Sequence, residues 1–172
     1  MRVLLLSDYS DSSGGAEKLA ILLRDELQRI GHQVCWLSSS ASTIGDSQAD
    51  HLCFGSTGRI RGPLQFFNPS AVLTLKRVLD EFKPDVVHVA MFLTQLSPAI
   101  LPLLAKVPTL YYAQWYRAIC LKGTRQLPNG QTCQQRAGLP CLTSNCLQFP
   151  EWLALSAGLQ LFRLWSDSFR AI

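Results

Sequence analysis

Short apolar runs alternate with amphipathic runs through the first two thirds of the chain, and no other feature constrains the fold as strongly. Residues 2–7 (RVLLLS) form a continuous apolar run of strand length, as expected for a strand that is covered on both faces. Residues 16–30 then place apolar side chains at helical spacing, and Gly31 follows as a helix stop. The chain is therefore expected to begin with a strand, a glycine loop and a helix.

The same unit recurs downstream. Asn68-Pro69 predicts a helix start, because Asn is a favourable N-cap and Pro a favourable first helical residue. Repeated strand and helix units predict a parallel sheet with helices on both faces. The other expected elements are strands at 33–38, 85–90 and 108–113, a weaker strand at 51–54, continuation of the Asn68 helix through Phe82, and a short helix from Ser97-Pro98 to about Lys106.

The pattern changes after Ala113. Residues 114–148 hold four of the six cysteines together with glycines and prolines, and their lack of periodicity indicates a long loop. A helix is expected at 150–166 with more apolar side chains than one buried stripe needs, so it either packs under the sheet or offers surface to another domain or to lipid. We expect the chain to stop inside a strand at SDSFRAI. The expected fold is thus α/β, a Rossmann-like parallel sheet with helices on both faces, followed by a long basic loop that carries cysteines and by a C-terminal helix.

Gly14 and Gly15 lie between the first strand and the first helix. Without a Cβ they let a ligand approach the backbone, and the free amides at a helix start favour an anion. Neither the dinucleotide fingerprint G-x-G-x-x-G nor a Walker lysine is present. Two interpretations therefore stay open for these glycines, a plain turn at a helix start and a loop that binds a ligand.

The positive charge of the chain is concentrated in its last third. Residues 1–106 carry ten basic and ten acidic side chains, whereas residues 113–150 carry four basic and no acidic ones. Such a stretch suits phosphate groups, an anionic membrane surface or an acidic partner, and it is also compatible with a solvated loop. No recognisable nucleic-acid reading module is present, so we expect no nucleic-acid partner.

The cysteines of the loop have no C-x2-C spacing, so a zinc site is only weakly supported and no metal site is predicted. Pairing of these thiols as disulfides and free thiols that pack the loop are the other interpretations. Structural disulfides would be unexpected without an export signal. The loop cysteines are Cys120, Cys133, Cys141 and Cys146, and the remaining two, Cys35 and Cys53, fall on predicted strands as buried thiols.

The N-terminal apolar run is too short for a signal peptide, because Ser7 and Asp8 end it. The later apolar stretches fall short of the roughly 20 residues that span a bilayer. We therefore expect a cytoplasmic protein, with contact at the inner membrane face left open.

Several segments, taken in order, resemble the N-terminal domain of family 4 glycosyltransferases of the GT-B type, which have two facing Rossmann-like domains. They are MRVLLLSDYSDSSGGAEKLAILLRDELQRIGHQV, FKPDVVHVAMFLTQLSPAIL, YRAIC and NGQTC. The resemblance implies that Gly14 and Gly15 face the cleft between the domains, near the acceptor and the phosphates of the donor. It also implies a nucleotide-sugar donor as substrate rather than a cofactor.

The resemblance points to three further substrate-binding candidates, His88, Gln114 and Arg117. The family often has a histidine before the Tyr-Arg pair, where this chain has Gln114 and Trp115. Glutamine can hydrogen-bond a hydroxyl but cannot take a proton, so it cannot act as a general base. Arg117 suits an acceptor phosphate or carboxylate, or alternatively a surface ion pair. His88 is also compatible with a purely structural role.

Taken together, residues 1–172 are interpreted as the acceptor-side domain of a retaining glycosyltransferase, cut before the C-terminal domain that would hold the donor. Such a chain should be inactive by itself, and no catalytic residue is assigned. The alternative is a non-catalytic flavodoxin-like module that binds a phosphorylated ligand or a partner protein. The expected acceptor is a carbohydrate or a lipid-linked molecule, and the sequence does not specify the identity of the sugar, the nucleotide or the acceptor.

Overall fold

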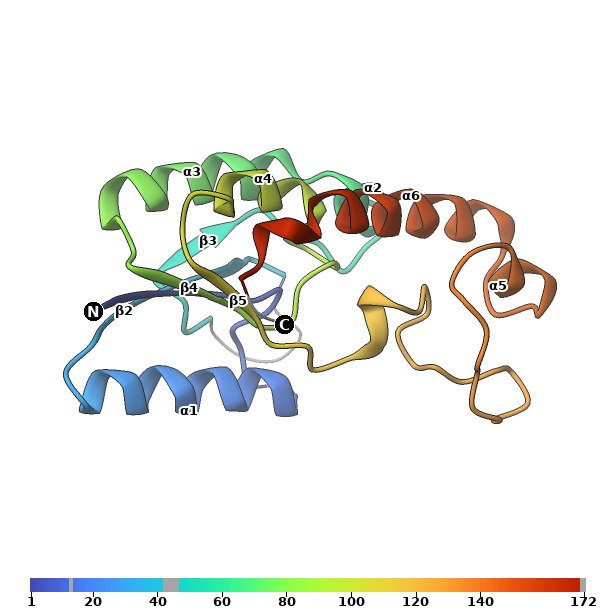
Figure 1. Cartoon of the computed structure of the whole chain (residues 1–172), viewed down its shortest axis with the longest axis horizontal. Coiled ribbons are helices and arrows are strands. Elements are labelled where there is room, and N and C mark those ends of the chain that lie inside the picture. Colours follow the sequence, from blue (N-terminus) through green and yellow to red (C-terminus); the bar gives the residue numbers. More distant parts are fainter. Residues whose placement is uncertain (13, 42–46, 171–172) are drawn as a thin grey trace.

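The computed structural model describes residues 1–12, 14–41 and 47–170. Five parallel strands form one sheet in the order β3-β2-β1-β4-β5, which confirms the predicted parallel sheet (Figure 1). The central β1 is covered on both faces, as its continuous apolar run predicts. The strands are β1 (Arg2–Leu6), β2 (Gln33–Ser39), β3 (His51–Cys53), β4 (Val86–Val89) and β5 (Thr109–Tyr111).

Helices cover both faces of the sheet. Helix α1 (Gly15–Arg29) lies on one face, and α3 (Pro69–Phe82), α4 (Leu101–Leu104) and α6 (Phe149–Trp165) lie on the other (Figure 1). Side chains of β1 alternate between two cores, because successive residues of a strand point to opposite faces. Val3 and Leu5 pack with Trp36 and Ala20 beneath α1, whereas Leu4 and Leu6 belong to the larger core on the other side.

The predicted cap of α3 is confirmed. The side chain of Asn68 accepts a hydrogen bond from the backbone N–H of Ala71 (3.2 Å), and Pro69 is the first helical residue. The side-chain amide of Asn68 also donates to the carbonyl groups of Phe54 (2.8 Å) and Gln95 (2.6 Å). The cap therefore ties α3 to two loops as well as starting the helix.

Two short helices were not expected from the sequence, α2 (Arg61–Phe66) and α5 (Leu139–Thr143). Gly62 and Pro63 are poor helix formers, so local propensity does not predict α2. Tertiary contact supplies the missing stability, because α2 packs against α6. At the contact, a Cβ on Gly158 of α6 would lie 3.7 Å from the carbonyl oxygen of Gln65, so the backbones approach closely.

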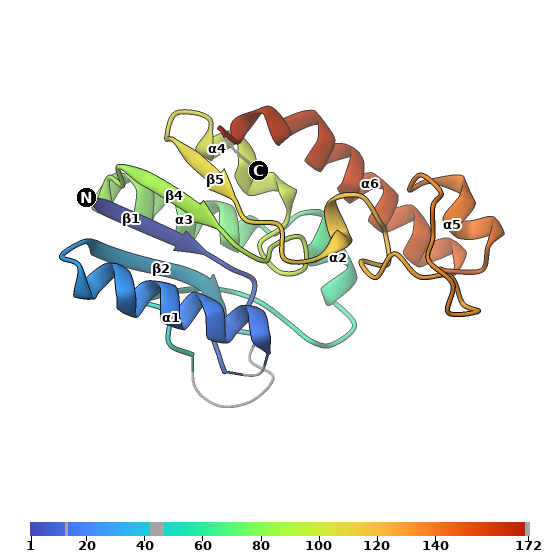
Figure 2. The same cartoon turned by 60° about the horizontal axis from the view of Figure 1, so that its bottom comes forward.

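Helix α6 and the preceding loop extend beyond the carboxyl ends of the strands, with α5 at the far end (Figure 2). The loop has little regular structure apart from α5 and a 3-10 turn at Tyr116–Ala118. Leu155, Leu159 and Phe162 bury one stripe of α6, which confirms that the helix packs on the sheet side. Leu153 and Leu164 remain exposed.

The expected strand at the end of the chain lies partly outside the described residues. Its described part forms a 3-10 turn, Ser166–Ser168, followed by Phe169 in an extended conformation. Phe169 stacks on Tyr111 of β5, with ring centroids 5.2 Å apart. The backbone N–H of Arg170 donates to the carbonyl of Thr109 (2.8 Å), so the chain runs beside β5 at this point.

None of the helices in the described part of the chain is both long enough and apolar enough to cross a bilayer.

Candidate functional site

The two glycines of the first loop differ in their surroundings. Gly14 is the N-cap of α1 and has no side-chain cap, because it has no side chain. A Cβ at Gly14 would collide with the carboxylate of Glu17, which is buried beside it, whereas Gly15 is exposed with open space around its Cα. The negative charge of Glu17 interacts favourably with the positive end of the helix dipole. An anion at this loop would therefore approach from the side of Gly15, since the side of Gly14 is covered by a carboxylate.

His88 lies on β4 and lines a cavity of about 210 Å³ beneath α1. Its ring packs on that of Tyr112, with centroids 6.0 Å apart. Burial lowers the pKa of His88, because it disfavours the charged imidazolium. The imidazole is therefore neutral at neutral pH and has one nitrogen able to accept a hydrogen bond. The opposite wall of the cavity consists of Leu19, Ala20 and Leu23 of α1.

Gln114 lines the same cavity, so the structure brings it together with His88. It also borders a narrow crevice with Ala16 and Glu17, at the start of α1. Its Oε1 atom is buried without a hydrogen-bond partner among the described residues. A buried acceptor without a partner is uncommon in native structures and marks a place where a donor is needed. Gln114 thus connects the His88 cavity to the start of the first helix.

Arg117 lies apart from this group. It lines a different cavity, of about 790 Å³, between α2 and α6. Its Nη2 donates to Oε1 of Gln65 (2.8 Å) and its Nη1 to the carbonyl of Leu121. Within the ranges that the structure describes, Arg117 forms no ion pair. The alternative interpretation from the sequence, a surface ion pair, is therefore not seen there. The segment 114–117 therefore runs from one cavity to the other.

Asp8 is a structurally central residue that sequence reasoning did not single out. Its carboxylate accepts hydrogen bonds from three consecutive backbone N–H groups, those of Thr94 (2.8 Å), Gln95 (2.7 Å) and Leu96 (2.9 Å). Its side chain is fully buried, and desolvation raises the pKa of Asp8 to about 6 against the lowering effect of these donors. The signal available in the sequence was an acidic residue directly after a buried strand.

The loop that Asp8 holds follows β4 at the carboxyl edge of the sheet. Leu93 and Ser97 have positive φ angles of 82° and 62°, which residues other than glycine rarely adopt. Such conformations cost about 1–3 kcal/mol each and persist only where the surroundings determine them. Asp8 and Asn68 supply the hydrogen bonds that do so.

The six cysteines are free thiols. Within residues 1–12, 14–41 and 47–170, no group of three or more His, Cys, Asp and Glu side chains is arranged to hold a metal ion.

The sequence profile of Glycosyltransferase Family 4 matches residues 13–117 of this chain. No curated protein sequence matches. Three similar solved structures are an alpha-glucosyltransferase in complex with UDP (15% identity, TM-score 0.43), MurG of Acinetobacter baumannii (18%, 0.46) and a sucrose-phosphate synthase from Thermosynechococcus elongatus (12%, 0.49). They are matched over 66%, 69% and 100% of this chain, which spans 28%, 35% and 47% of theirs. The chain thus covers less than half the length of these proteins.

Proposed function

The chain belongs to glycosyltransferase family 4, and on this basis we propose that residues 1–172 are the N-terminal, acceptor-side domain of a retaining enzyme of the GT-B type. That enzyme would move a sugar from a nucleotide-sugar to an acceptor. The nucleotide would be held mainly by a second domain. The retaining outcome follows from the family resemblance and from no residue of this chain.

The juxtaposition of His88 and Gln114 is the observation that supports the proposal most. Both line one cavity at the carboxyl edge of a parallel sheet, where ligands of open α/β folds bind. Neutral His88 accepts a hydrogen bond from an acceptor hydroxyl, and the side chain of Gln114 provides a second polar contact in the same cavity. The amides at Gly14 and Gly15 would contact the donor phosphates from the open side of Gly15. Arg117 would contribute from the neighbouring cavity.

During transfer, the bond between the anomeric carbon and the phosphate oxygen of the nucleotide breaks, and the nucleotide leaves with the electron pair. A bond forms between the anomeric carbon and the acceptor oxygen, and the proton that this oxygen loses goes to the departing phosphate. Gln114 cannot receive this proton, because an amide is not a base at neutral pH. Its role is therefore to orient the acceptor. We assign no catalytic residue.

Transfer assays on the enzyme that contains this domain test the proposal. With a panel of UDP- and GDP-sugars, we expect His88→Ala and Gln114→Ala to reduce kcat/KM by about tenfold or more, because each removes a hydrogen bond to the acceptor. Leu22→Ala, on the exposed face of α1, is the matched control and should leave kcat/KM unchanged. Full activity of both site variants would contradict the proposal.

The division of labour is tested on the 172-residue chain by itself. We expect neither measurable sugar transfer nor tight UDP or GDP binding, because the second domain supplies most nucleotide contacts in the proposed arrangement. Equilibrium dialysis with labelled nucleotide measures this. A Kd in the micromolar range would contradict the assignment of donor binding to another domain.

A second candidate function is a non-catalytic module that binds a phosphorylated ligand or a partner protein. The observation in its favour is Gln114, which stands where the resembled family often has a histidine and which cannot serve as a base. Sugar transfer that depends on His88 and Gln114 would exclude this alternative, whereas binding of a phosphorylated ligand without any transfer would favour it.

A further inference from the structure

The cavity between α2 and α6 combines cations with apolar walls. It is bounded by both helices and by residues 115–122, and its volume of about 790 Å³ lies in the range of about 300–1,000 Å³ typical of small-molecule sites. Its described lining includes three cations, Arg61, Arg117 and Lys122, against a single acid, Glu151. The cavity therefore has an excess of positive charge.

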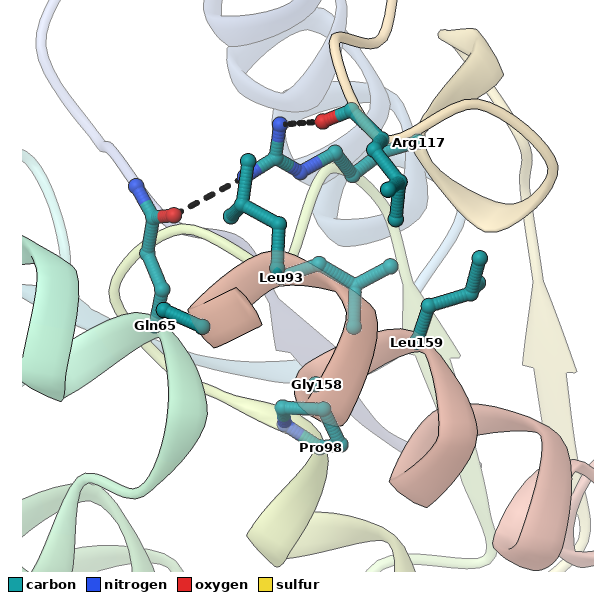
Figure 3. A pocket seen from close by; sticks show the side chains of 9 residues that line it. Gln65, Leu93, Pro98, Arg117, Gly158 and Leu159 are labelled. Atoms are coloured by element: carbon teal, nitrogen blue, oxygen red, sulfur yellow. Dashed lines mark hydrogen bonds between the residues drawn. The ribbon is translucent and has the colours of Figure 1, made fainter. Parts of the chain in front are cut away.

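Arg117 is held rigidly by neutral groups. Its guanidinium donates a hydrogen bond to the side chain of Gln65 (Figure 3) and another to the backbone carbonyl of Leu121. The guanidinium also lies 5.7 Å from the centre of the Trp115 ring, within the range of cation–π attraction. These contacts fix its position without neutralising it, so its charge remains available to a ligand.

No carboxylate in the described part of the chain forms an ion pair with any of the three cations. Burial of Arg117 lowers its pKa, and the nearby charge of the exposed Arg61 lowers it further, so the two guanidinium groups repel each other across the cavity. Guanidinium groups so placed are suited to an oxyanion such as phosphate, which they bind through paired hydrogen bonds.

The rest of the lining is apolar. Phe66 of α2 and Leu153 of α6 are 40% and 54% exposed, and Leu147 and Pro150 also line the cavity. A small inorganic anion would leave these side chains in water. A ligand with an apolar chain would cover them, and removing this apolar surface from water would favour binding.

We propose that this cavity binds a phosphate group carried on an apolar chain, with Arg61 and Arg117 on the phosphate oxygens and the chain along α2 and α6. If this ligand is the sugar acceptor, the inference rests on the proposed function. Binding of the ligand to the cavity can be measured whether or not the enzyme transfers a sugar.

Ligand binding is measured by equilibrium dialysis with farnesyl phosphate below its micelle concentration, and with farnesol and inorganic phosphate as comparison ligands. We expect farnesyl phosphate to bind at least about tenfold more tightly than either, because only it engages both the cations and the apolar walls. Equal binding of farnesol would reveal a merely apolar site, and equal binding of inorganic phosphate a merely anionic one. Either result overturns the proposal.

Two variants test the cations. Arg117→Gln should weaken farnesyl phosphate binding by about tenfold or more, the effect of losing a charge-assisted contact. The double variant Arg61→Gln, Lys122→Gln changes exposed side chains only, so it keeps the test valid if Arg117→Gln fails to fold. The control is Arg77→Gln, on the exposed face of α3. Unchanged affinity in the folded cavity variants overturns the proposal.

Vesicles separate a bound lipid phosphate from a membrane surface. Suppose that the chain sediments with phosphatidylglycerol vesicles, that the cation variants abolish this, and that the chain does not bind soluble farnesyl phosphate. The cations then bind an anionic membrane surface, and the proposal is wrong. Binding without any sugar transfer supports the cavity and counts against the proposed function alone. Transfer that Arg117→Gln leaves unaffected keeps sugar transfer as the function but excludes Arg117 and this cavity from the acceptor site, which overturns the proposal made here.

Discussion

At the scale of single residues, Asp8 couples the first strand to a loop more than eighty positions away, through its bonds to Thr94, Gln95 and Leu96. The carboxylate satisfies three buried donors but is itself fully desolvated. These two effects oppose each other, because hydrogen bonds to a carboxylate favour its charged form and burial disfavours it. The pKa of Asp8, raised to about 6, indicates that burial prevails.

The raised pKa of Asp8 predicts a specific pH dependence of stability. The carboxyl group of Asp8 binds its proton more tightly in the folded chain than in the unfolded chain, where the pKa of Asp8 is 3.8. The corresponding stabilisation is complete below that value and is lost as the pH rises through about 6. Relative to Asp8→Asn, which does not titrate, the wild-type free energy of unfolding should rise by about 2 kcal/mol between pH 7.5 and pH 4.5. Urea unfolding at both pH values measures it. If the free energies of unfolding of wild type and Asp8→Asn differ by the same amount at both pH values, the three donors keep the carboxylate ionised.

At the scale of elements, α6 is anchored by one buried stripe and exposes apolar side chains elsewhere. Leu159 is 5% exposed in the core, whereas Leu164 is 69% exposed on the same helix. The exposed Leu153, near the start of the helix, lines the cavity between α2 and α6, whereas Leu164 does not line it.

This pair of leucines gives a matched test of how α6 packs. Leu159→Ala should lower the free energy of unfolding by about 2–5 kcal/mol, through lost burial and the cavity left behind. Leu164→Ala makes the same chemical change with the same effect on helix propensity, and should cost no more than about 0.5 kcal/mol. Denaturant unfolding of both variants provides the measurement. Similar losses in the two would mean that α6 does not pack as described.

At the scale of the whole molecule, the cysteines report on the integrity of the sheet. Cys35 and Cys53 lie on β2 and β3, and burial raises the pKa of Cys35 to about 11 and that of Cys53 to about 12. Thiolates, not thiols, react with alkylating reagents. In contrast, Cys133 and Cys141 lie partly exposed in the loop after β5.

We therefore expect iodoacetamide at pH 8 to modify Cys133 and Cys141 in the folded chain while Cys35 and Cys53 stay unmodified. Mass spectrometry of the peptides measures this, with chain unfolded in denaturant as the control in which all four react. Modification of the two strand cysteines should begin only at the denaturant concentration that unfolds the sheet. Equal rates for all four in the folded chain would contradict the described core.

The sequence by itself determined the strand and helix order, the cap at Asn68 and the family, because periodicity, capping and ordered motifs are properties of neighbouring residues. It also singled out His88 and Gln114, which the fold brings to one cavity. Only the tertiary structure decided that Arg117 lies in another cavity, that α2 forms, and that Asp8 holds residues 94–96. These features depend on contacts between segments distant along the chain, and such contacts leave no period in the sequence.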